Sequence, residues 1–317
     1  MLDPVFAGAR KFLSQYLPQT RLIASRSLTE FSQQHVYLKL ECELPTGSFK
    51  VRGALYALGM EMQRRKVREV VASSTGNHGA AVAYAAKLLG IKARVFLPEK
   101  NNPVKRANIA RLGAEIVENG SVDLAAAFEE ASEYARETGA YFLNDATDPD
   151  LPAGPGTIAC EILEQAPEVD AIYVPMGDTA LIRGVASAAK QLSSKVKIIG
   201  VQSERAPSYF LSWTEGRAIE TETCDTIADG LATRTPVSEN VAAIRELVDE
   251  VMLVSEGEML GAIGRLLMAE HVVAEPAGAA ASAAFLKSPQ DDGRTVALLV
   301  TGANLSAETL KRVVNIL

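Results

Sequence analysis

Cysteine is scarce in this chain of 317 residues, since only three are present, at Cys42, Cys160 and Cys224. An odd number of widely separated cysteines gives no metal-binding spacing and no disulfide framework, and it is typical of a reducing compartment. No uncharged apolar run approaches the roughly 18 residues that a bilayer-spanning helix needs. Asp3 and Pro4 precede any apolar run, which argues against a signal peptide. We therefore expect a soluble, cytoplasmic protein.

An excess of positive charge is also lacking, because the formal net charge is -7. This value argues against a nucleic-acid-binding surface or an anionic membrane as a partner. No Gly-x-Gly-x-x-Gly turn follows a predicted strand, so a dinucleotide-binding oxidoreductase is set aside. With 48% hydrophobic and 22% charged residues, the chain has an ordinary globular composition and sufficient length for one large or two ordinary domains.

A regular alternation of strands and helices occupies most of the chain. In the first half we expect strands over residues 36–40, 69–73, 94–97 and 115–117, with helices over 3–16, 80–89, 103–112 and 121–137, the last capped by Ser121. In the second half we expect strands over 171–174, 196–200, 251–254 and 296–300, with helices over 181–192, 259–268 and after Pro276. Units that recur about every 25 residues indicate parallel β-α units rather than a solenoid.

This pattern predicts an α/β protein with two open twisted α/β domains and a ligand site in the cleft between them. The expected large domain comprises residues 1–52 and 147–317, and the expected small, mobile domain comprises residues 53–146. Closure of the small domain over a ligand is a hypothesis that follows from this layout.

Residues 45–54, Pro-Thr-Gly-Ser-Phe-Lys-Val-Arg-Gly-Ala, lead from a predicted strand into an apolar helix and place Lys50 at the start of that helix. The positive end of the helix dipole disfavours an ammonium group there. Burial would lower the pKa of Lys50 further and make it a usable amine nucleophile. A lysine considered alone, however, is most often a solvated surface residue.

Three further turns follow predicted strands. Residues 73–79, Ser-Ser-Thr-Gly-Asn-His-Gly, expose backbone N–H groups that could bind a carboxylate or phosphate, although a plain N-cap is equally possible. Residues 175–181 could hold a phosphate through their amides and the Thr179 hydroxyl, although Asp178 brings like charge and, alone, this stretch favours a capped helix start. The Thr301 hydroxyl could meet a heterocyclic nitrogen, or the turn could bind nothing. Together with Lys50, these features suit a phosphorylated aldehyde cofactor held as a Schiff base.

Taken in order, these stretches resemble the fold-type II pyridoxal-phosphate enzymes, specifically the serine/threonine dehydratase and serine racemase family, with its tryptophan synthase β-like fold. The matching stretches cover nearly the whole chain and are residues 45–54, 74–79, 153–157 (Ala-Gly-Pro-Gly-Thr), 226–231 (Thr-Ile-Ala-Asp-Gly-Leu), 275–279 (Glu-Pro-Ala-Gly-Ala) and 301–304 (Thr-Gly-Ala-Asn). The resemblance implies pyridoxal 5'-phosphate as cofactor and a homodimer.

The resemblance also implies roles for single residues. Lys50 would bind the cofactor as a Schiff base and move the Cα proton, with Thr75 as a second acid/base on the opposite face. Residues expected to hold the cofactor's ring and phosphate are Phe49, Asn77, Gly177, Asp178, Thr179, Ala180, Leu181, Glu275 and Thr301. Residues expected to hold the substrate carboxylate through their amides are Ser74, Thr75, Gly76, Asn77 and His78.

Three departures from the family pattern matter. Asp178, Thr179 and Ala180 stand where the family's phosphate loop has glycines, and Arg183 could compensate by turning inward. Thr75 keeps a hydroxyl where racemases of the group have serine, so racemisation could accompany the main reaction. The positions that correspond to the family's cation site, Gln202, Ala206 and Ser208, lack carboxylates, so we expect no bound metal.

The resemblance predicts a dehydratase, or ammonia-lyase, that converts a β-hydroxy amino acid to the 2-oxo acid and ammonia by α,β-elimination. Serine, threonine and a bulkier 3-hydroxy amino acid are all candidate substrates. The alternatives are a racemase or β-replacement enzyme on the same scaffold, and a non-catalytic protein that binds the cofactor or an amino acid.

Overall fold

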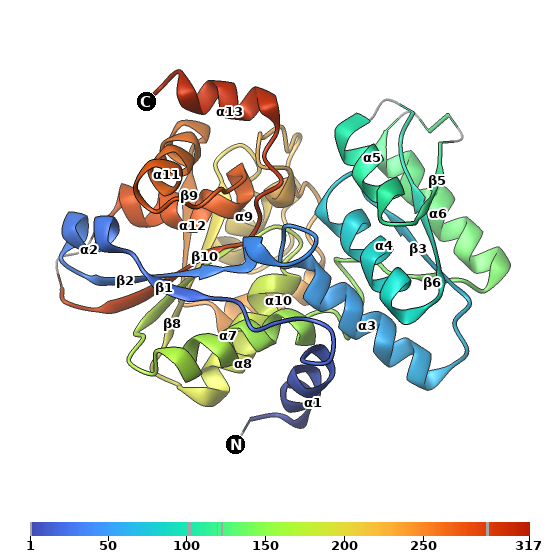
Figure 1. The fold of residues 1–317 in the computed structure, drawn as a ribbon, viewed down its shortest axis with the longest axis horizontal. Coiled ribbons are helices and arrows are strands. Elements are labelled where there is room, and N and C mark those ends of the chain that lie inside the picture. Colours follow the sequence, from blue (N-terminus) through green and yellow to red (C-terminus); the bar gives the residue numbers. More distant parts are fainter. Residues whose placement is uncertain (1, 100–102, 119, 122, 290–291) are drawn as a thin grey trace.

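A computed structural model of the chain describes residues 2–99, 103–118, 120–121, 123–289 and 292–317 and contains two β-sheets (Figure 1). The six-stranded sheet has the order β1-β2-β10-β7-β8-β9. Its strands are β1 (Leu22–Ala24), β2 (His35–Leu40), β7 (Ala171–Pro175), β8 (Lys197–Ser203), β9 (Glu250–Val254) and β10 (Thr295–Val300). All neighbours in this sheet are parallel except β1, which pairs antiparallel with β2.

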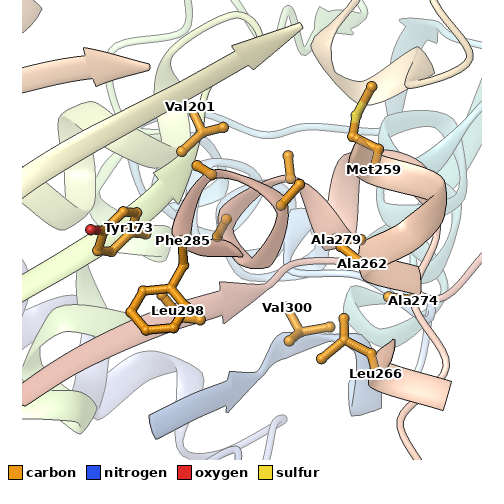
Figure 2. Packing of buried hydrophobic residues seen from close by; sticks show 14 of the residues in the cluster. Tyr173, Val201, Met259, Ala262, Leu266, Ala274, Ala279, Phe285, Leu298 and Val300 are labelled. Carbon is orange, nitrogen blue, oxygen red and sulfur yellow. The ribbon is translucent and has the colours of Figure 1, made fainter. Parts of the chain in front are cut away.

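Helices cover both faces of the six-stranded sheet, so its central strands are buried and nearly continuous in hydrophobic residues. One face packs on α11 (Glu256–Ala269) and α12 (Pro276–Lys287), where Phe285 meets Tyr173 edge-on with ring centroids 6.0 Å apart (Figure 2). The other face packs on α7 (Ala153–Gln165), α8 (Ala180–Leu192) and α10 (Ser238–Leu247). Successive residues of β7 alternate between these two cores, as the pleat of a strand requires.

The four-stranded sheet has the order β5-β4-β3-β6 and is parallel throughout. Its strands are β3 (Glu69–Ser73), β4 (Lys92–Phe96), β5 (Glu115–Val117) and β6 (Tyr141–Phe142), and its helices are α4 (Asn77–Leu89), α5 (Pro103–Arg111) and α6 (Leu124–Thr138). Helix α3 (Lys50–Arg64) runs between the two sheets and connects them (Figure 1). We call the six-stranded sheet with its helices the large unit, and the four-stranded sheet with its helices the small unit.

The remaining elements lie around the large unit. They are α1 (Pro4–Leu13), α2 (Arg26–Ser32), α9 (Ser208–Glu215), α13 (Ala307–Val314) and the short 3-10 turns η1 (Glu41–Glu43) and η2 (Asp229–Leu231). Within the described ranges, no helix combines the length and the apolar character that a membrane crossing requires.

The expected α/β architecture is confirmed, with parallel strands in two open sheets. Strands 69–73 and 115–117 have the expected bounds. The expected cap at Ser121 was wrong: the Asp123 carboxylate accepts the Ala126 N–H at 2.9 Å and starts the helix, whereas the Ser121 hydroxyl donates to Glu130. The N-terminal helix ends at Leu13 rather than near residue 16. The domain boundaries stay a prediction.

Candidate active site

Lys50 is the first residue of α3, and the segment that precedes it is fixed to the end of β10. The Phe49 N–H donates to the Thr301 carbonyl at 3.0 Å, and Ser48 forms an isolated bridge with Gly302. The turn before it needs glycine, because Gly47 has φ +69 and a Cβ there would lie 2.8 Å from the Asn304 side chain. The lysine is therefore held at the carboxyl end of β10, one of the two central strands of the six-stranded sheet.

The Lys50 ammonium forms an ion pair with Asp145, with 2.8 Å between Nζ and Oδ2. Asp145 follows β6 of the small unit, so this pair joins the two units. The expectation of a lowered lysine pKa was wrong. Burial lowers the pKa of Lys50, but the negative charges of Asp145, Asp178 and Glu275 outweigh it, and the net shift is upward.

A chain of side-chain hydrogen bonds crosses from the small unit to the large unit beside Lys50. The Asn77 amide donates to Glu275 Oε1 at 2.6 Å, and the Asn304 amide donates to Asn77 Oδ1 at 2.7 Å. Asn77 begins α4, whereas Glu275 precedes α12, and Asn304 follows β10. The structure thus brings together Asn77, Glu275 and the lysine turn, as the sequence predicted for a site between two α/β units.

Two helix N-termini provide open backbone donors at this site. In α4 the first helical hydrogen bond runs from the Ala80 N–H to the Gly76 carbonyl at 3.2 Å, so the amides of residues 77–79 have no intrahelical acceptor. In α8 the first such bond runs from the Arg183 N–H to the Thr179 carbonyl at 2.9 Å. Free amides at a helix start favour an anion.

Asp178 does not cap α8. Its Oδ1 accepts a hydrogen bond from the Thr233 hydroxyl at 3.1 Å, and burial raises the pKa of Asp178 to about 6. Thr179 has φ +67, a left-handed conformation that is rare for a β-branched residue. The Arg183 guanidinium lies against this turn, because its Nε donates to the Thr179 hydroxyl at 3.2 Å and its NH2 to the Ala146 carbonyl at 3.3 Å.

The residues present fit a phosphorylated aromatic aldehyde. A Cβ at Gly177 would lie 2.2 Å from the Gly230 carbonyl oxygen. Any other residue at position 177 would therefore force the backbone before α8 to move. Among the described residues, the buried Thr301 hydroxyl has one hydrogen-bond partner, the Ala277 carbonyl, at the long distance of 3.4 Å. An amine, two rows of amides and a hydroxyl are the groups that such a cofactor requires. The roles of the single residues remain predictions.

The described part of the chain contains no cluster of three or more His, Cys, Asp or Glu residues placed to hold a metal ion. At the positions compared with the family's cation site, Gln202 Oε1 accepts the Phe210 N–H at 2.8 Å and the Ser208 hydroxyl donates to the Thr233 carbonyl at 2.6 Å. The expected absence of a metal stays a prediction.

Sequence reasoning missed Asp145 and gave the side chain of His78 no chemical role. The His78 Nε2 lies 2.8 Å from the Leu143 carbonyl, so it carries the proton, and the buried Nδ1 has no hydrogen-bond partner in the described protein. Nδ1 lies 4.0 Å from Asp145 Oδ2. The one available signal was the polar pair that begins at Asn144, directly after an apolar run in a β-α unit.

A buried group of charges, which we call the Arg52 network, anchors the first turn of α3. Arg52 Nε donates to Glu41 at 2.7 Å, and its NH1 donates to Glu161 at 2.6 Å. Lys39 Nζ donates to the same Glu161 carboxylate at 2.6 Å. All four side chains are nearly inaccessible to solvent. Because Arg52 follows Lys50 by two residues, the network also holds the lysine in place.

We expect Glu275→Gln to make the protein less sensitive to rising pH. Burial raises the pKa of Glu275 from 4.5 to about 7, although the hydrogen bond from Asn77 opposes this shift. Between these values the folded protein keeps a proton that the unfolded chain loses, so the wild type loses stability as pH rises. Between pH 5 and 8 the free energy of unfolding of the wild type should fall by an amount on the order of 2 kcal/mol. Its melting temperature should fall by about 3 °C. Thermal melts between pH 5 and 8 check this, with the exposed Glu215→Gln as control. The prediction would be contradicted if the melting temperatures of the wild type and Glu275→Gln changed by the same amount over this pH range.

Comparisons with known proteins place this chain among cofactor-dependent enzymes. The model of a family described as pyridoxal-phosphate dependent enzymes matches residues 13–302. An L-threonine ammonia-lyase of Thermotoga maritima is 38% identical over 307 residues, which are 97% of this chain and 76% of that protein. The catabolic L-threonine dehydratase of Escherichia coli K12 is 33% identical, over 96% of this chain and 93% of that protein.

Solved structures show the same likeness. A threonine deaminase of T.th. superposes with a TM-score of 0.90 at 35% identity, covering 96% of this chain and 99% of that chain. The serine racemase of maize superposes with a TM-score of 0.91 at 29% identity, covering 99% of this chain and 96% of that chain.

Proposed function

Because this chain belongs to the family of pyridoxal-phosphate dependent enzymes, we propose that it eliminates water from a 3-hydroxy amino acid and releases the 2-oxo acid and ammonia. The observation that carries this proposal is the position of Lys50 at the start of α3, directly after a residue whose N–H donates to the Thr301 carbonyl at the end of β10. The relatives named threonine ammonia-lyase and threonine dehydratase support it. Serine, threonine and bulkier 3-hydroxy amino acids are the substrates to compare.

The cofactor, when bound, withdraws electrons from the substrate Cα. Lys50 would hold the cofactor through Nζ and then take the proton from Cα, while the amides of residues 74–78 bind the substrate carboxylate. The amides of residues 177–181 would hold the cofactor phosphate, with Phe49 against the ring, Asn77 at its hydroxyl and Glu275 orienting Asn77. Thr301 cannot keep a proton on a ring nitrogen as a carboxylate would. Prompt loss of the β-hydroxyl is therefore favoured over reactions that need a long-lived negative charge on Cα.

Racemisation is a second candidate activity, and the hydroxyl of Thr75 is the observation that favours it. Thr75 stands next to Gly76 at the start of α4, where a hydroxyl could return a proton to the opposite face of Cα. The maize serine racemase is among the similar structures. The proposal also includes a homodimer, which the family resemblance implies, a cytoplasmic location, which the composition favours, and a small mobile unit that closes over the substrate.

A panel of 3-hydroxy amino acids tests the proposed elimination. The cofactor-loaded enzyme should release 2-oxo acid and ammonia in equal amounts from at least one member. Chiral analysis of the remaining amino acid measures racemisation in the same samples. An enzyme that binds the cofactor but releases no 2-oxo acid from any member, with or without an added thiol, would contradict elimination. Racemisation and β-replacement would then be tested next.

A further inference from the structure

Asp145 and His78 form a pair of hydrogen-bond acceptors beside the reactive amine. The Asp145 carboxylate lies 2.8 Å from Lys50 Nζ and 4.0 Å from the unpartnered Nδ1 of His78. Burial lowers the pKa of His78, so the ring is neutral, and its one proton is committed to the Leu143 carbonyl. The Asp145 carboxylate and the unprotonated Nδ1 of His78 are both hydrogen-bond acceptors, so each requires a hydrogen-bond donor.

The loop that presents Asp145 is fixed on both sides. The Ala146 N–H donates to Asn144 Oδ1 at 2.9 Å, and the Ala146 carbonyl accepts from Asn240 at 3.0 Å and from Arg183 at 3.3 Å. The Asp145 side chain keeps 25% of its surface exposed. Its carboxylate is therefore held in place and can still be reached by a small molecule.

The charge balance of the site depends on Lys50. The other two carboxylates that act on the lysine have neutral hydrogen-bond donors, since Thr233 donates to Asp178 and Asn77 donates to Glu275. Asp145 is paired with the lysine itself. If Lys50 binds the cofactor, as the proposed function requires, its Nζ keeps at most one N–H, so Asp145 loses the free ammonium with which it pairs here and can accept from a further donor.

We propose that Asp145 and His78 Nδ1 bind an ammonium group on the substrate side chain, so that the preferred substrate is a 3-hydroxy amino acid with an amine on the γ-carbon or one carbon further. This inference rests on the proposed function. The substrate's own amine would take the place of Lys50 Nζ on the cofactor, and the released Lys50 must be a neutral amine to accept the Cα proton, so it would not supply Asp145 with a cation. An ammonium supplies three donors and a positive charge, whereas the methyl group of threonine supplies neither.

Binding of two isosteric amino acids without a leaving hydroxyl tests this directly. 2,4-Diaminobutanoate carries an ammonium where 2-aminopentanoate carries a methyl group. Their affinities for the cofactor-loaded enzyme can be measured from the change in the cofactor's absorbance. The wild type should bind the diamino acid about tenfold to a hundredfold more tightly, as for a part-buried charge pair. Asp145→Asn keeps the shape and removes the charge, and it should reduce this preference to within about threefold.

A second matched pair carries the test into turnover. 2,4-Diamino-3-hydroxybutanoate and 2-amino-3-hydroxypentanoate differ in the same way, and the preference should appear as a lower KM for the cationic substrate. Asp150→Asn is the control, because Asp150 lies on the same connection between β6 and α7 but pairs with Arg64, at 2.9 Å, rather than with Lys50. It should leave both preferences unchanged, and the folded content of each variant is checked by circular dichroism.

The outcomes separate this inference from the proposed function. Equal affinities for the two isosteres, or a preference that survives in Asp145→Asn, would overturn the ammonium site even if serine or threonine is turned over. A charge-dependent preference in binding, without 2-oxo acid from any hydroxy amino acid, would support the ammonium site and contradict the elimination.

Discussion

Lys50→Ala should lower 2-oxo acid release by at least about 10⁴-fold, because the proposed mechanism uses this one amine to hold the cofactor and to move the Cα proton. The variant should also lack the visible absorbance of the lysine-bound cofactor. The backbone at this position should survive, since the Phe49–Thr301 hydrogen bond and the Arg52 network do not involve the lysine side chain. Asp145 loses its ammonium partner in the variant.

The control for this prediction is Lys87→Ala, which removes an exposed lysine near the end of α4. It should retain both absorbance and activity. Near-normal turnover by Lys50→Ala would remove Lys50 from the mechanism. Loss of activity with normal lysine-type absorbance would mean that another amine holds the cofactor. A high concentration of an added small amine should restore part of the proton transfer in Lys50→Ala if its role is that of a base.

Glu161→Ala should destabilise the folded protein by about 3–5 kcal/mol. Glu161 accepts hydrogen bonds from both Arg52 and Lys39, at 2.6 Å each, and the side chains of all three are almost fully buried. Its removal leaves the two cations Arg52 and Lys39 with one remaining carboxylate, Glu41, and the side chains of these three residues are almost fully buried. Because the network anchors the first turn of α3, affinity for the cofactor should fall as well.

Glu164→Ala on the same helix is the matched control. Glu164 pairs with Arg10, but its side chain is 57% exposed, so its loss should cost less than about 1 kcal/mol. Urea unfolding of both variants and the wild type gives the comparison. Free energies of unfolding that agree within about 1 kcal/mol for Glu161→Ala and Glu164→Ala would show that the Arg52 network contributes little to stability.

Local patterns in the sequence predicted most of the regular elements of the fold. The strand Glu69–Ser73 has an apolar centre, Val70 to Ala72, before a glycine-containing turn, and both the type and the bounds of that strand followed from this pattern. The helix start near residue 121 was misplaced, because Ser121 and Asp123 are both good caps and only the chain path decides between them. The two-residue strand β6 is too short to produce a periodic pattern.

The candidate site was predictable where it depends on local turns and not where it depends on distant partners. Lys50, Asn77 and Thr301 stand in turns after strands, and parallel strands bring such turns to one edge. Asp145 belongs to no recognisable motif, and it is separated in sequence by 95 residues from Lys50, with which it pairs. The upward shift in the pKa of Lys50 could therefore not be predicted from the sequence. The Arg52 network left only a weak signal, namely single charged residues inside apolar runs.

The strand order also governs how this chain can assemble during its synthesis. All four strands of the small sheet lie between residues 69 and 142, so they leave the ribosome together and can pair at once. In the six-stranded sheet β10 separates β2 from β7, and it is the last strand to be made. Until residue 300 has emerged, the large sheet remains two unjoined parts with open edges, and Lys50 has no Thr301 beside it. A nascent or truncated chain that ends before β10 therefore carries the lysine but has no active site around it.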